Sequence, residues 1–571
     1  MSKNKYKNKK QKSFFFSDYI ESEITYQKRN INSIKVSSNR TTVLFFVFFS
    51  LILIFSIKII YLSLYPQKNL LSVKVYNNFV KERGDILDRN ENILASNINI
   101  YDAAIRPSLV KDKKKLIINL KLIFPSINSS KIMESLLSNK YFYIKKRLTE
   151  GEYTKLWLLG NKAIDFPKRQ NRIYPQKNLF SHIIGQIDDN NTGISGLEKS
   201  FNDSLKSSSL ALTVDSNLQY LIREELINAQ SNFNNKGSAA ILMDVQTGEV
   251  LSLISLPDYD LNERASIKDK NFLNKITLGV YELGSVFKTF TIAAALENNI
   301  INTNTIFKNL KNSINCDKYT ISEHDKLPKN LSTEQILIRS SNIGAVRIAQ
   351  KLGVEKYKNF LNSLELLDQI NFDLKEIGTP LPFKWGKCKL ATTSYGHGIT
   401  TTPLQLAKAY AILGNGGYKI EPFILKKKKN YLTKKEQVVS SKTSASINSM
   451  LRKVVSLNEG TANFANIEGF DIGGKTGSAD KYNSTEKLNT FVALFPSSRP
   501  KYVLLVILDE PKAAPSFVYD FPPSDKFPNG YKHKGENRNT SGWNAVVVSG
   551  KIIEKIGPIL AIKNLQTSKN F

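Results

Sequence analysis

The chain has 571 residues, more than one ordinary domain, and enough to bury a sizeable core in two or three domains. Its formal charge is +31, but no arginine-rich helix or nucleic-acid-binding module accompanies that charge, so a nucleic-acid-binding protein is not indicated. The two cysteines and four histidines lack metal-ligand spacing, so we expect neither a metal site nor a cofactor.

The N-terminal region predicts a membrane anchor. Residues 1–41 carry ten Lys and Arg against three acidic residues, and Val43–Leu64 is almost wholly apolar, with Lys58 as its one charge. An apolar helix of about 22 residues spans a hydrocarbon core of roughly 30 Å. Because the basic flank precedes the span, we expect residues 1–41 in the cytoplasm, an anchor at 42–64 and the remainder outside, in the periplasm. No cleavage site typical of a signal peptide follows the apolar run.

Residues 66–203 predict a separate, elongated α+β module. Its expected features are a strand at Leu71–Val75, a turn-rich segment at Arg83–Asn90 and helical periodicity over residues 110–160. None of these residues has the spacing of a catalytic site, so a spacer or interaction role is expected. The serine-rich segment Ser204–Ser209 predicts a linker at the end of the module.

Residues 210–562 have the pattern of a compact α/β domain. Asp215–Gln230 predicts a helix capped by Asp215 or Ser216, and two apolar strands follow at Ser238–Val245 and Val250–Leu256 with a hairpin turn between them. Far downstream, the sequence predicts two more strands and a last amphipathic helix, at Thr490–Phe495, Tyr502–Leu508 and Trp543–Ile556. We therefore expect one sheet built from both ends of the domain, with a helical insertion between them.

The segment Tyr281–Phe290 contains a candidate nucleophile. Ser285 follows a glycine turn at the expected start of an apolar helix, and Lys288 lies at i,i+3 on the same face. Burial lowers the pKa of a lysine, a neutral amine can take a proton from a serine hydroxyl, and a helix N-terminus favours negative charge on the oxygen. Because Ser-x-x-Lys also occurs by chance in many helices, this pair alone is weak evidence for an active site.

Two further motifs strengthen the prediction. Ser340 and Asn342 lie where a helix is expected to begin. The Ser340 hydroxyl can relay a proton, and the Asn342 amide can hydrogen-bond both a catalytic lysine and a substrate amide. Gly473–Ser478 follows a predicted strand at Phe470–Ile472. Its glycines allow a substrate backbone to lie close, and its polar side chains, Lys475, Thr476 and Ser478, can bind a carboxylate.

Ser-x-x-Lys, Ser-x-Asn and Lys-Thr-Gly in this order form the motif set of penicillin-binding proteins and class A β-lactamases. From residue 40 to 560 the sequence resembles class B penicillin-binding proteins, the monofunctional peptidoglycan DD-transpeptidases. Tyr281–Lys288 is similar to the family's Tyr-Glu-Pro-Gly-Ser-x-Phe-Lys, with Leu283 in place of Pro, which is expected to loosen the turn, and Ser478 replaces the more usual Thr. The segments Arg83–Asn90 and Gly196–Glu198 look like the start and end of the family's pedestal. The resemblance to the division-specific, septal subgroup lies in Tyr395–Ile399, Thr402–Leu406 and Gly542–Asn544.

The resemblance implies a fold, a reaction and a set of roles. The fold would be an α/β sheet of the transpeptidase and serine β-lactamase type with helices on both faces, beside an elongated α+β pedestal and one transmembrane helix. Ser285 would attack the bond between two D-alanines and Lys288 would accept its proton, while Ser340 and Lys475 would protonate the leaving D-alanine. Backbone N–H groups of Ser285 and Ser478 would form the oxyanion hole. The resemblance also implies the substrate-binding residues, namely Asn342 for an amide and Lys475, Thr476, Gly477 and Ser478 for the carboxylate.

The resemblance further implies partners: peptidoglycan stem peptides on lipid-linked glycan strands, β-lactams as covalent inhibitors, a polymerase of the SEDS type, and other division proteins. Three alternatives remain open. An elongation-specific transpeptidase would share all three motifs, and a β-lactam sensor or hydrolase would share the serine and lysine, although no dedicated base for hydrolysis is evident. A non-enzymatic scaffold of the division machinery is the third.

Several residues carry open expectations. His397 lies between two glycines, and either contact with substrate or a structural role fits it, whereas His182, His324 and His533 are expected to be structural or solvated. Cys316 and Cys388 could pair, but the sequence does not show whether they reach each other. The segment Pro511–Thr540 is either a mobile surface loop or a partner-binding lip near the active site.

Overall fold

The computed structural model describes residues 33–64, 83–188, 190–263, 272–317, 319–427, 436–481, 484–521 and 530–569. The chain divides into two units, residues 1–80 and 81–571, which are described separately. The strand expected at Leu71–Val75 and most of the basic tail lie outside the described residues.

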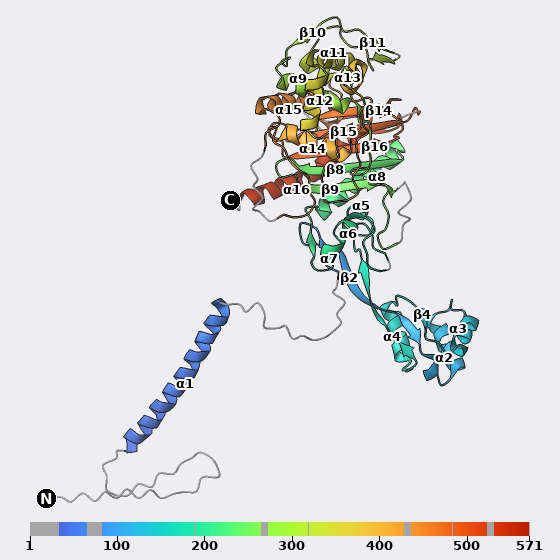
Figure 1. Ribbon diagram of the computed structural model, residues 1–571, viewed down its shortest axis with the longest axis vertical. Helices are drawn as coiled ribbons and strands as arrows, with labels where there is room; N and C mark the ends of the chain where they lie inside the picture. Colours follow the sequence, from blue (N-terminus) through green and yellow to red (C-terminus); the bar gives the residue numbers. More distant parts are fainter. Residues whose placement is uncertain are drawn as a thin grey trace, which may run out of the picture. The chain divides into compact units, whose positions relative to one another are not determined.

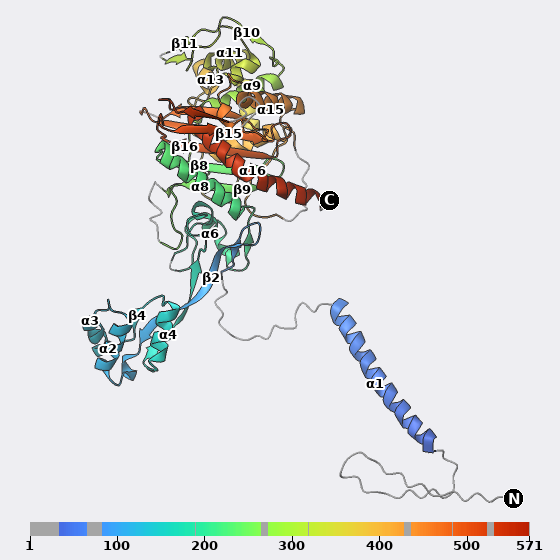
Figure 2. The ribbon, with the colours of Figure 1, turned by 180° about the vertical axis from the view of Figure 1, so that it is seen from behind.

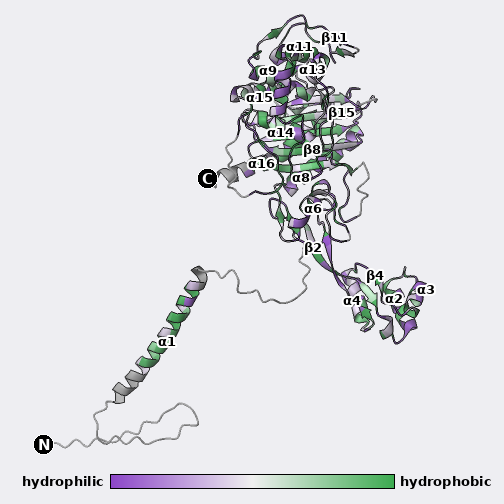
Figure 3. Ribbon diagram, viewed as in Figure 1, coloured by the Kyte–Doolittle hydropathy of each residue, from purple (hydrophilic) through white to green (hydrophobic). Residues whose placement is uncertain are grey.

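The first unit contains one long apolar helix, α1 (Ser33–Leu64), shown in Figure 1. Its segment Thr41–Tyr61 has a mean hydropathy of 2.8, and none of it is buried inside the structure. Figure 3 shows hydrophobic residues along the described part of this helix. A helix that is apolar on every face and uncovered by protein is suited to lipid, in agreement with the expected anchor.

The second unit begins with an α+β module built around the long strand β2 (Ile93–Tyr101). One sheet has the order β6-β2-β1-β7, with β1 at Ile86–Leu87, β6 at Lys168–Ile173 and β7 at Leu210–Ala211. A second sheet, β4-β3-β5, contains Phe142–Lys145, Ala103–Ile105 and Ile164–Asp165. Three helices pack with this second sheet around a core of their own: α2 (Lys113–Ile123), α3 (Ser129–Leu137) and α4 (Glu150–Leu158).

A buried ion triad holds the first sheet to the short helices beside it. Glu198, fully buried in α6 (Gly196–Ser200), accepts hydrogen bonds from Arg83 Nε at 2.5 Å and from Arg172 Nε at 2.8 Å. The neighbouring helices are α5 (Ser181–Ile184) and α7 (Asn202–Leu205). Because two arginines share one carboxylate away from water, loss of the carboxylate would leave both charges uncompensated.

The linker expected at Ser204–Ser209 is wrong in one respect, since this segment is held by the fold. It begins inside α7, and Leu205 O accepts a hydrogen bond from Gly84 N at 2.6 Å. Ser209 Oγ accepts from Asp85 N at 3.0 Å, and β7 pairs in parallel with β1 directly afterwards. Serine-rich composition suggested a flexible chain, but the hydroxyls of Ser207 and Ser208 donate to Ser204 O, and Ser209 accepts from the backbone just before β1.

The following domain is organised around a five-stranded antiparallel sheet in the order β14-β15-β16-β8-β9. Its strands are β8 (Gly237–Asp244), β9 (Val250–Leu256), β14 (Gly473–Asp480), β15 (Lys487–Phe495) and β16 (Tyr502–Asp509). The predicted sheet from both ends of the domain is therefore confirmed, as is the β8–β9 hairpin. Asp244, at its turn, accepts from Gln246 N and Thr247 N at 2.8 Å each.

Helices cover both faces of this sheet, as Figures 1 and 2 show from opposite sides. α8 (Ser216–Phe233) and α16 (Ala545–Lys569) pack on one face, and α14 (Pro403–Gly414) packs on the other. Asp215 caps α8 by accepting from Asn217 N and Leu218 N, as expected. The helical insertion contains α9 (Lys288–Glu297), α10 (Thr333–Ile338), α11 (Asn342–Leu352), α12 (Val354–Ser363), α13 (Lys387–Thr393) and α15 (Ser441–Ser456).

Several expected boundaries differ from the structure. The strand expected at Phe470–Ile472 starts instead at Gly473, because Asp471 O and Oδ2 accept from Ser497 N and Ser498 N in the β15–β16 turn. The last helix starts at Ala545, two residues later than expected, after a 3₁₀ turn at Ser541–Trp543, and it continues to Lys569, past the expected end at Ile556. In addition, Cys316 and Cys388 form a disulfide that joins the hairpin β11 (Ser313–Cys316)–β12 (Tyr319–Ser322) to α13.

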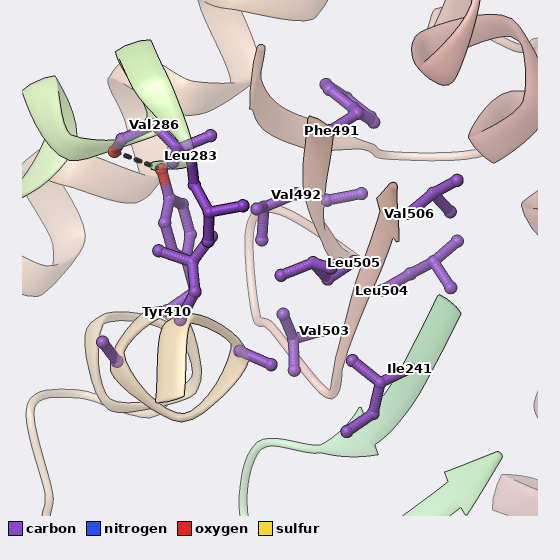
Figure 4. Close-up of a cluster of buried hydrophobic side chains, with 14 of the residues drawn as sticks. Ile241, Leu283, Val286, Tyr410, Phe491, Val492, Val503, Leu504, Leu505 and Val506 are labelled. Atoms are coloured by element: carbon purple, nitrogen blue, oxygen red, sulfur yellow. Dashed lines mark hydrogen bonds between the residues drawn. The ribbon is translucent and has the colours of Figure 1, made fainter. Parts of the chain in front are cut away.

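Figure 4 shows how the core supports the turn that contains Ser285. Val503 and Leu505 point from β16 towards Tyr410 of α14, and their neighbours Leu504 and Val506 point to the opposite face. Tyr410 OH donates to Val286 O at 2.9 Å, as the dashed line shows. Each fully buried apolar side chain of this kind contributes about 1.5–3 kcal/mol.

Candidate active site

Ser285 lies in a 3₁₀ turn, Gly284–Phe287, and the α-helix α9 begins only at Lys288. The expectation that Ser285 starts the α-helix itself is therefore wrong by one turn, although Ser285 still precedes the helix N-terminus. Gly284 has φ +65°, a left-handed conformation that favours glycine. Ser285 is 8% exposed, so its hydroxyl is within reach of a ligand while the turn around it is buried.

Two backbone segments press against this turn. A Cβ on Gly396 would lie 1.9 Å from Gly284 O, and a Cβ on Gly477 would lie 2.2 Å from Leu283 O. The loop Tyr395–Gly398 and strand β14 therefore pack so closely against the turn that no side chain fits in place of Gly396 or Gly477. Leu283, expected to loosen the turn, is fully buried in the core.

Lys288 is fully buried and contacts Ser340 rather than Ser285. Its Nζ donates to Ser340 O and to Ser340 Oγ, the latter at 3.0 Å. Among the described residues, no hydrogen bond joins Lys288 to Ser285 Oγ, so the expected direct bond is absent. Burial lowers the pKa of Lys288 to about 7, although the negative charge of Glu323 acts to raise it. An amine of this kind is substantially neutral near neutral pH.

Ser340 Oγ lies between two buried amines. Lys475 Nζ donates to it at 2.9 Å, opposite Lys288, and also donates to Thr476 O and Thr476 Oγ1 at 3.2 Å each. Burial, and secondarily the charge of Lys288, holds the pKa of Lys475 well below its usual range. Ser340 itself has φ +58°, which brings its hydroxyl and carbonyl to the same amine. The structure thus brings three of the four predicted catalytic residues into one hydrogen-bonded chain, with Ser285 one helical turn before Lys288.

Asn342 occupies the first position of α11. Its Nδ2 donates to Ser322 O at 2.7 Å, and its buried Oδ1 has no hydrogen-bond partner among the described residues. Asn342 therefore contacts neither lysine through a hydrogen bond, in contrast to the sequence-based expectation. A buried acceptor without a partner at this position can accept a hydrogen bond from an amide N–H of a ligand.

Glu323 is a residue that the sequence did not identify. Its carboxylate accepts from Ser341 Oγ at 2.5 Å, from Asn342 N at 2.7 Å and from Ile343 N at 3.0 Å. It thereby caps α11 and fixes the turn that carries Ser340. No local pattern marks Glu323, because it follows β12, nineteen residues before Asn342, and only the fold brings the two together.

Strand β14 lies at the edge of the sheet, since β15 is its one neighbour in the strand order. An edge strand offers free N–H and C=O groups to an extended peptide. Thr476 Oγ1 also contacts Thr461 Oγ1 at 2.8 Å, and Ser478 Oγ accepts from Ser541 N at 3.0 Å. Lys475, Thr476, Gly477 and Ser478 thus form one rim of the site beside Ser285.

The remaining histidines lie in different settings. His182 is half-buried, its surroundings lower its pKa to about 4 by desolvation, and its Nε2 contacts Phe272 O. His324 has a lowered pKa because of burial and the charge of Lys288. His397 pairs with Glu282, and His533 packs against Trp543. Over the described residues, no group of three or more His, Cys, Asp or Glu is arranged to hold a metal ion.

The described part of the segment Pro511–Thr540 forms a hairpin of β17 (Val518–Phe521) and β18 (Tyr531–Lys534). Tyr519 stacks on Phe464 at 4.7 Å between ring centroids, and its OH donates to Trp543 O at 2.6 Å. The base of the segment is therefore packed, while its central residues lie outside the described ranges. Its expected role as a loop or a partner-binding lip stays a prediction.

Known protein families and relatives match most of this chain. The family described as "Penicillin binding protein transpeptidase domain" matches residues 238–519, and "Penicillin-binding Protein dimerisation domain" matches residues 80–217. The chain is 30% identical to the probable peptidoglycan D,D-transpeptidase FtsI of Caulobacter vibrioides, over 84% of this chain and 82% of the relative. It is 28% identical to stage V sporulation protein D of Bacillus subtilis, over 77% and 76%.

A relative from Buchnera aphidicola subsp. Baizongia pistaciae, named peptidoglycan D,D-transpeptidase FtsI, is 30% identical over 85% of this chain and 93% of its own length. Among solved structures, penicillin-binding protein 3 from Mycobacterium tuberculosis in its apo form matches with a TM-score of 0.62. That match has 20% identity and covers 85% of this chain and 96% of the other, so it supports the fold alone.

Proposed function

The chain belongs to the class B penicillin-binding proteins, and from that premise we propose that it is the peptidoglycan D,D-transpeptidase of the division septum. In this role it cross-links stem peptides by transferring an acyl group from a D-Ala-D-Ala donor to an acceptor amine. The observation that carries the proposal is Ser340 Oγ, which lies 3.0 Å from Lys288 Nζ and 2.9 Å from Lys475 Nζ beside the Ser285 turn.

In the first half of the reaction Ser285 Oγ attacks the carbonyl carbon between the two D-alanines. Lys288, neutral because it is buried, takes the hydroxyl proton once the serine rotates towards it in the substrate complex. The chain from Lys288 through Ser340 to Lys475 then supplies a proton to the amine of the leaving D-alanine. Both lysines already donate to Ser340 Oγ, so the transfer requires no large movement.

Substrate binding in this proposal uses the edge strand β14 and the start of α11. The terminal carboxylate binds Thr476, Ser478 and Lys475, with Gly477 allowing the substrate backbone to approach. The orphaned Oδ1 of Asn342 accepts an amide N–H of the donor peptide. The backbone N–H groups of Ser285 and Ser478 stabilise the tetrahedral oxyanion. An acceptor amine then attacks the acyl-enzyme and releases Ser285.

The cellular setting is part of the proposal. Residues 1–41 form a cytoplasmic tail, 42–64 a single anchor in the inner membrane, 66–203 the pedestal, and 210–562 the periplasmic transpeptidase domain. The basic residues before the apolar helix support this orientation. A SEDS-type polymerase and other division proteins are the proposed partners, contacted through the anchor and the pedestal, and lipid-linked glycan strands supply the substrate.

The proposal is tested with the full chain in detergent micelles and a fluorescent penicillin. Ser285→Ala is expected to abolish the covalent adduct, and Lys288→Arg to slow its formation at least about 100-fold, since arginine does not deprotonate. Ser446→Ala, on the exposed face of α15, is the matched control and should label normally. Labelling of Ser285→Ala at the rate of the unaltered chain would refute the assignment.

A further inference from the structure

A second pair of titratable side chains lies beside the Ser285 turn and takes no part in the steps above. His397 Nδ1 is 3.2 Å from Glu282 Oε2. Glu282 lies three residues before Ser285, and His397 lies in the loop Tyr395–Gly398 that encloses the turn. The pair therefore stands on the segments that hold the nucleophile, and not on β14 or α11, where Lys475 and Asn342 lie.

The loop fixes the position of the imidazole. Gly396 touches the backbone of Gly284, and His397 N donates to Thr392 O at 3.0 Å. Lys389 Nζ donates to Gly398 O, and the His397 ring stacks on Tyr395 with 6.2 Å between centroids and 10° between planes. A side chain held by its backbone, its ring neighbour and its carboxylate partner is positioned as a functional group must be.

His397 is nevertheless accessible. Its side chain is 64% exposed, and Nε2 has no hydrogen-bond partner among the described residues. One nitrogen of the ring thus pairs with a carboxylate, and the other can receive a ligand. In this arrangement the carboxylate orients the imidazole, and the second nitrogen exchanges protons. By contrast, the amines of Lys288 and Lys475 are buried and already share Ser340.

We propose that Glu282 and His397 form the acceptor subsite, where they bind the incoming primary ammonium group and His397 removes its proton. This inference rests on the proposed function, because it concerns the second half of the same reaction. An ammonium cannot attack an ester, so one proton must leave before the new bond forms. The carboxylate of Glu282 attracts the cation and stabilises the imidazolium that results.

The ammonium gives one proton to His397 Nε2, which later releases it to water. The free amine nitrogen then bonds to the acyl carbon, the bond from that carbon to Ser285 Oγ breaks, and the second N–H proton returns to Ser285 Oγ through Lys288. The products are an amide, a free serine and one proton in solution.

The other titratable groups around His397 fit this role. Tyr395 has its pKa raised to about 12 by burial and by Glu282, so it stays neutral beneath the ring. Burial lowers the pKa of Lys389, while the charge of Glu282 acts to raise it. The Lys389 amine donates to Gly398 O and lies 4.3 Å from the centre of the Phe383 ring, so it is already engaged by the loop. His397 and Glu282 are therefore the groups that this loop presents to an incoming amine.

The test compares two amines as acceptors for the full chain acylated by a thioester analogue of the donor. One is strongly basic and arrives protonated, such as a lysine side-chain amine, and the other is hydroxylamine, which is mostly unprotonated at neutral pH. His397→Gln and Glu282→Gln are compared with His533→Gln, a matched change at a histidine outside the loop. Fluorescent penicillin labelling of Ser285 reports whether each variant remains folded and able to acylate.

We expect His397→Gln to lower amide formation with the basic amine about 100-fold. Labelling by penicillin should stay within about twofold, and amide formation with hydroxylamine should be nearly unchanged. Glu282→Gln should give a smaller loss of the same kind, and His533→Gln should give none. An equal loss with both amines would show a structural role and overturn the proposal, as would no loss with either. Failure of the proposed function is distinct, since the unaltered chain would then form no acyl-enzyme.

Discussion

The pH dependence of acylation is the prediction that follows most directly from the buried lysines. If neutral Lys288 takes the proton of Ser285, the acylation rate follows the neutral fraction of its amine. With the pKa of Lys288 at about 7, that fraction is about one half at pH 7, about 9% at pH 6 and about 1% at pH 5. The rate constant should therefore fall about 100-fold from pH 9 to pH 5, and level off above about pH 8. An ordinary lysine would instead give a rate that still rises about tenfold per pH unit near neutrality.

The measurement is the second-order rate constant of fluorescent-penicillin labelling at a series of pH values, for the unaltered chain and Glu323→Gln. The charge of Glu323 raises the pKa of Lys288, so its removal should move the midpoint of the acid limb to lower pH. Glu355→Gln, an exposed change on α12, is the control and should leave the midpoint in place. A midpoint above about pH 9, or an unchanged midpoint in Glu323→Gln, would refute the reasoning that burial and Glu323 set the state of Lys288.

Three further changes test how the site is held. Gly396→Ala would put a Cβ 1.9 Å from Gly284 O, so penicillin labelling should fall more than about tenfold, and normal labelling would contradict the packing described. Tyr410→Phe removes the hydroxyl that donates to Val286 O and should cost about 1–3 kcal/mol, read as a lower melting temperature. Glu198→Ala leaves Arg83 and Arg172 uncompensated, at a cost of about 3–5 kcal/mol. Limited proteolysis should then cut the pedestal while Ser285 still labels, and an unchanged digestion pattern would argue against the triad.

Local pattern predicted the elements whose determinants are local. The β8–β9 hairpin, the Asp215 cap and the β15 and β16 strands follow from alternation, turn residues and side-chain capping within a few residues of each other. The short motifs likewise singled out Ser340 and Lys475 by residue type and order, and the fold brings the two together; their catalytic role stays a prediction.

What the sequence did not predict depends on contacts between distant segments. Ser340 and Lys288 are 52 positions apart, and their bond replaces the expected one to Ser285 because the left-handed backbone at Ser340 turns its oxygens towards the amine. Glu323 acts on α11 only through the fold. Ser204–Ser209 looked like a linker because composition does not show that the next two residues, Leu210–Ala211, form strand β7 and pair with β1.

The central claim, that Ser285 is the nucleophile and Ser340 a relay, is tested most directly by mapping the attachment site. The full chain is acylated with a penicillin, digested, and its peptides are sequenced by tandem mass spectrometry. The adduct is expected on Ser285 and not on Ser340, although Ser340 Oγ is the hydroxyl that accepts hydrogen bonds from both buried lysines. An adduct on Ser340 in the unaltered chain would contradict this claim.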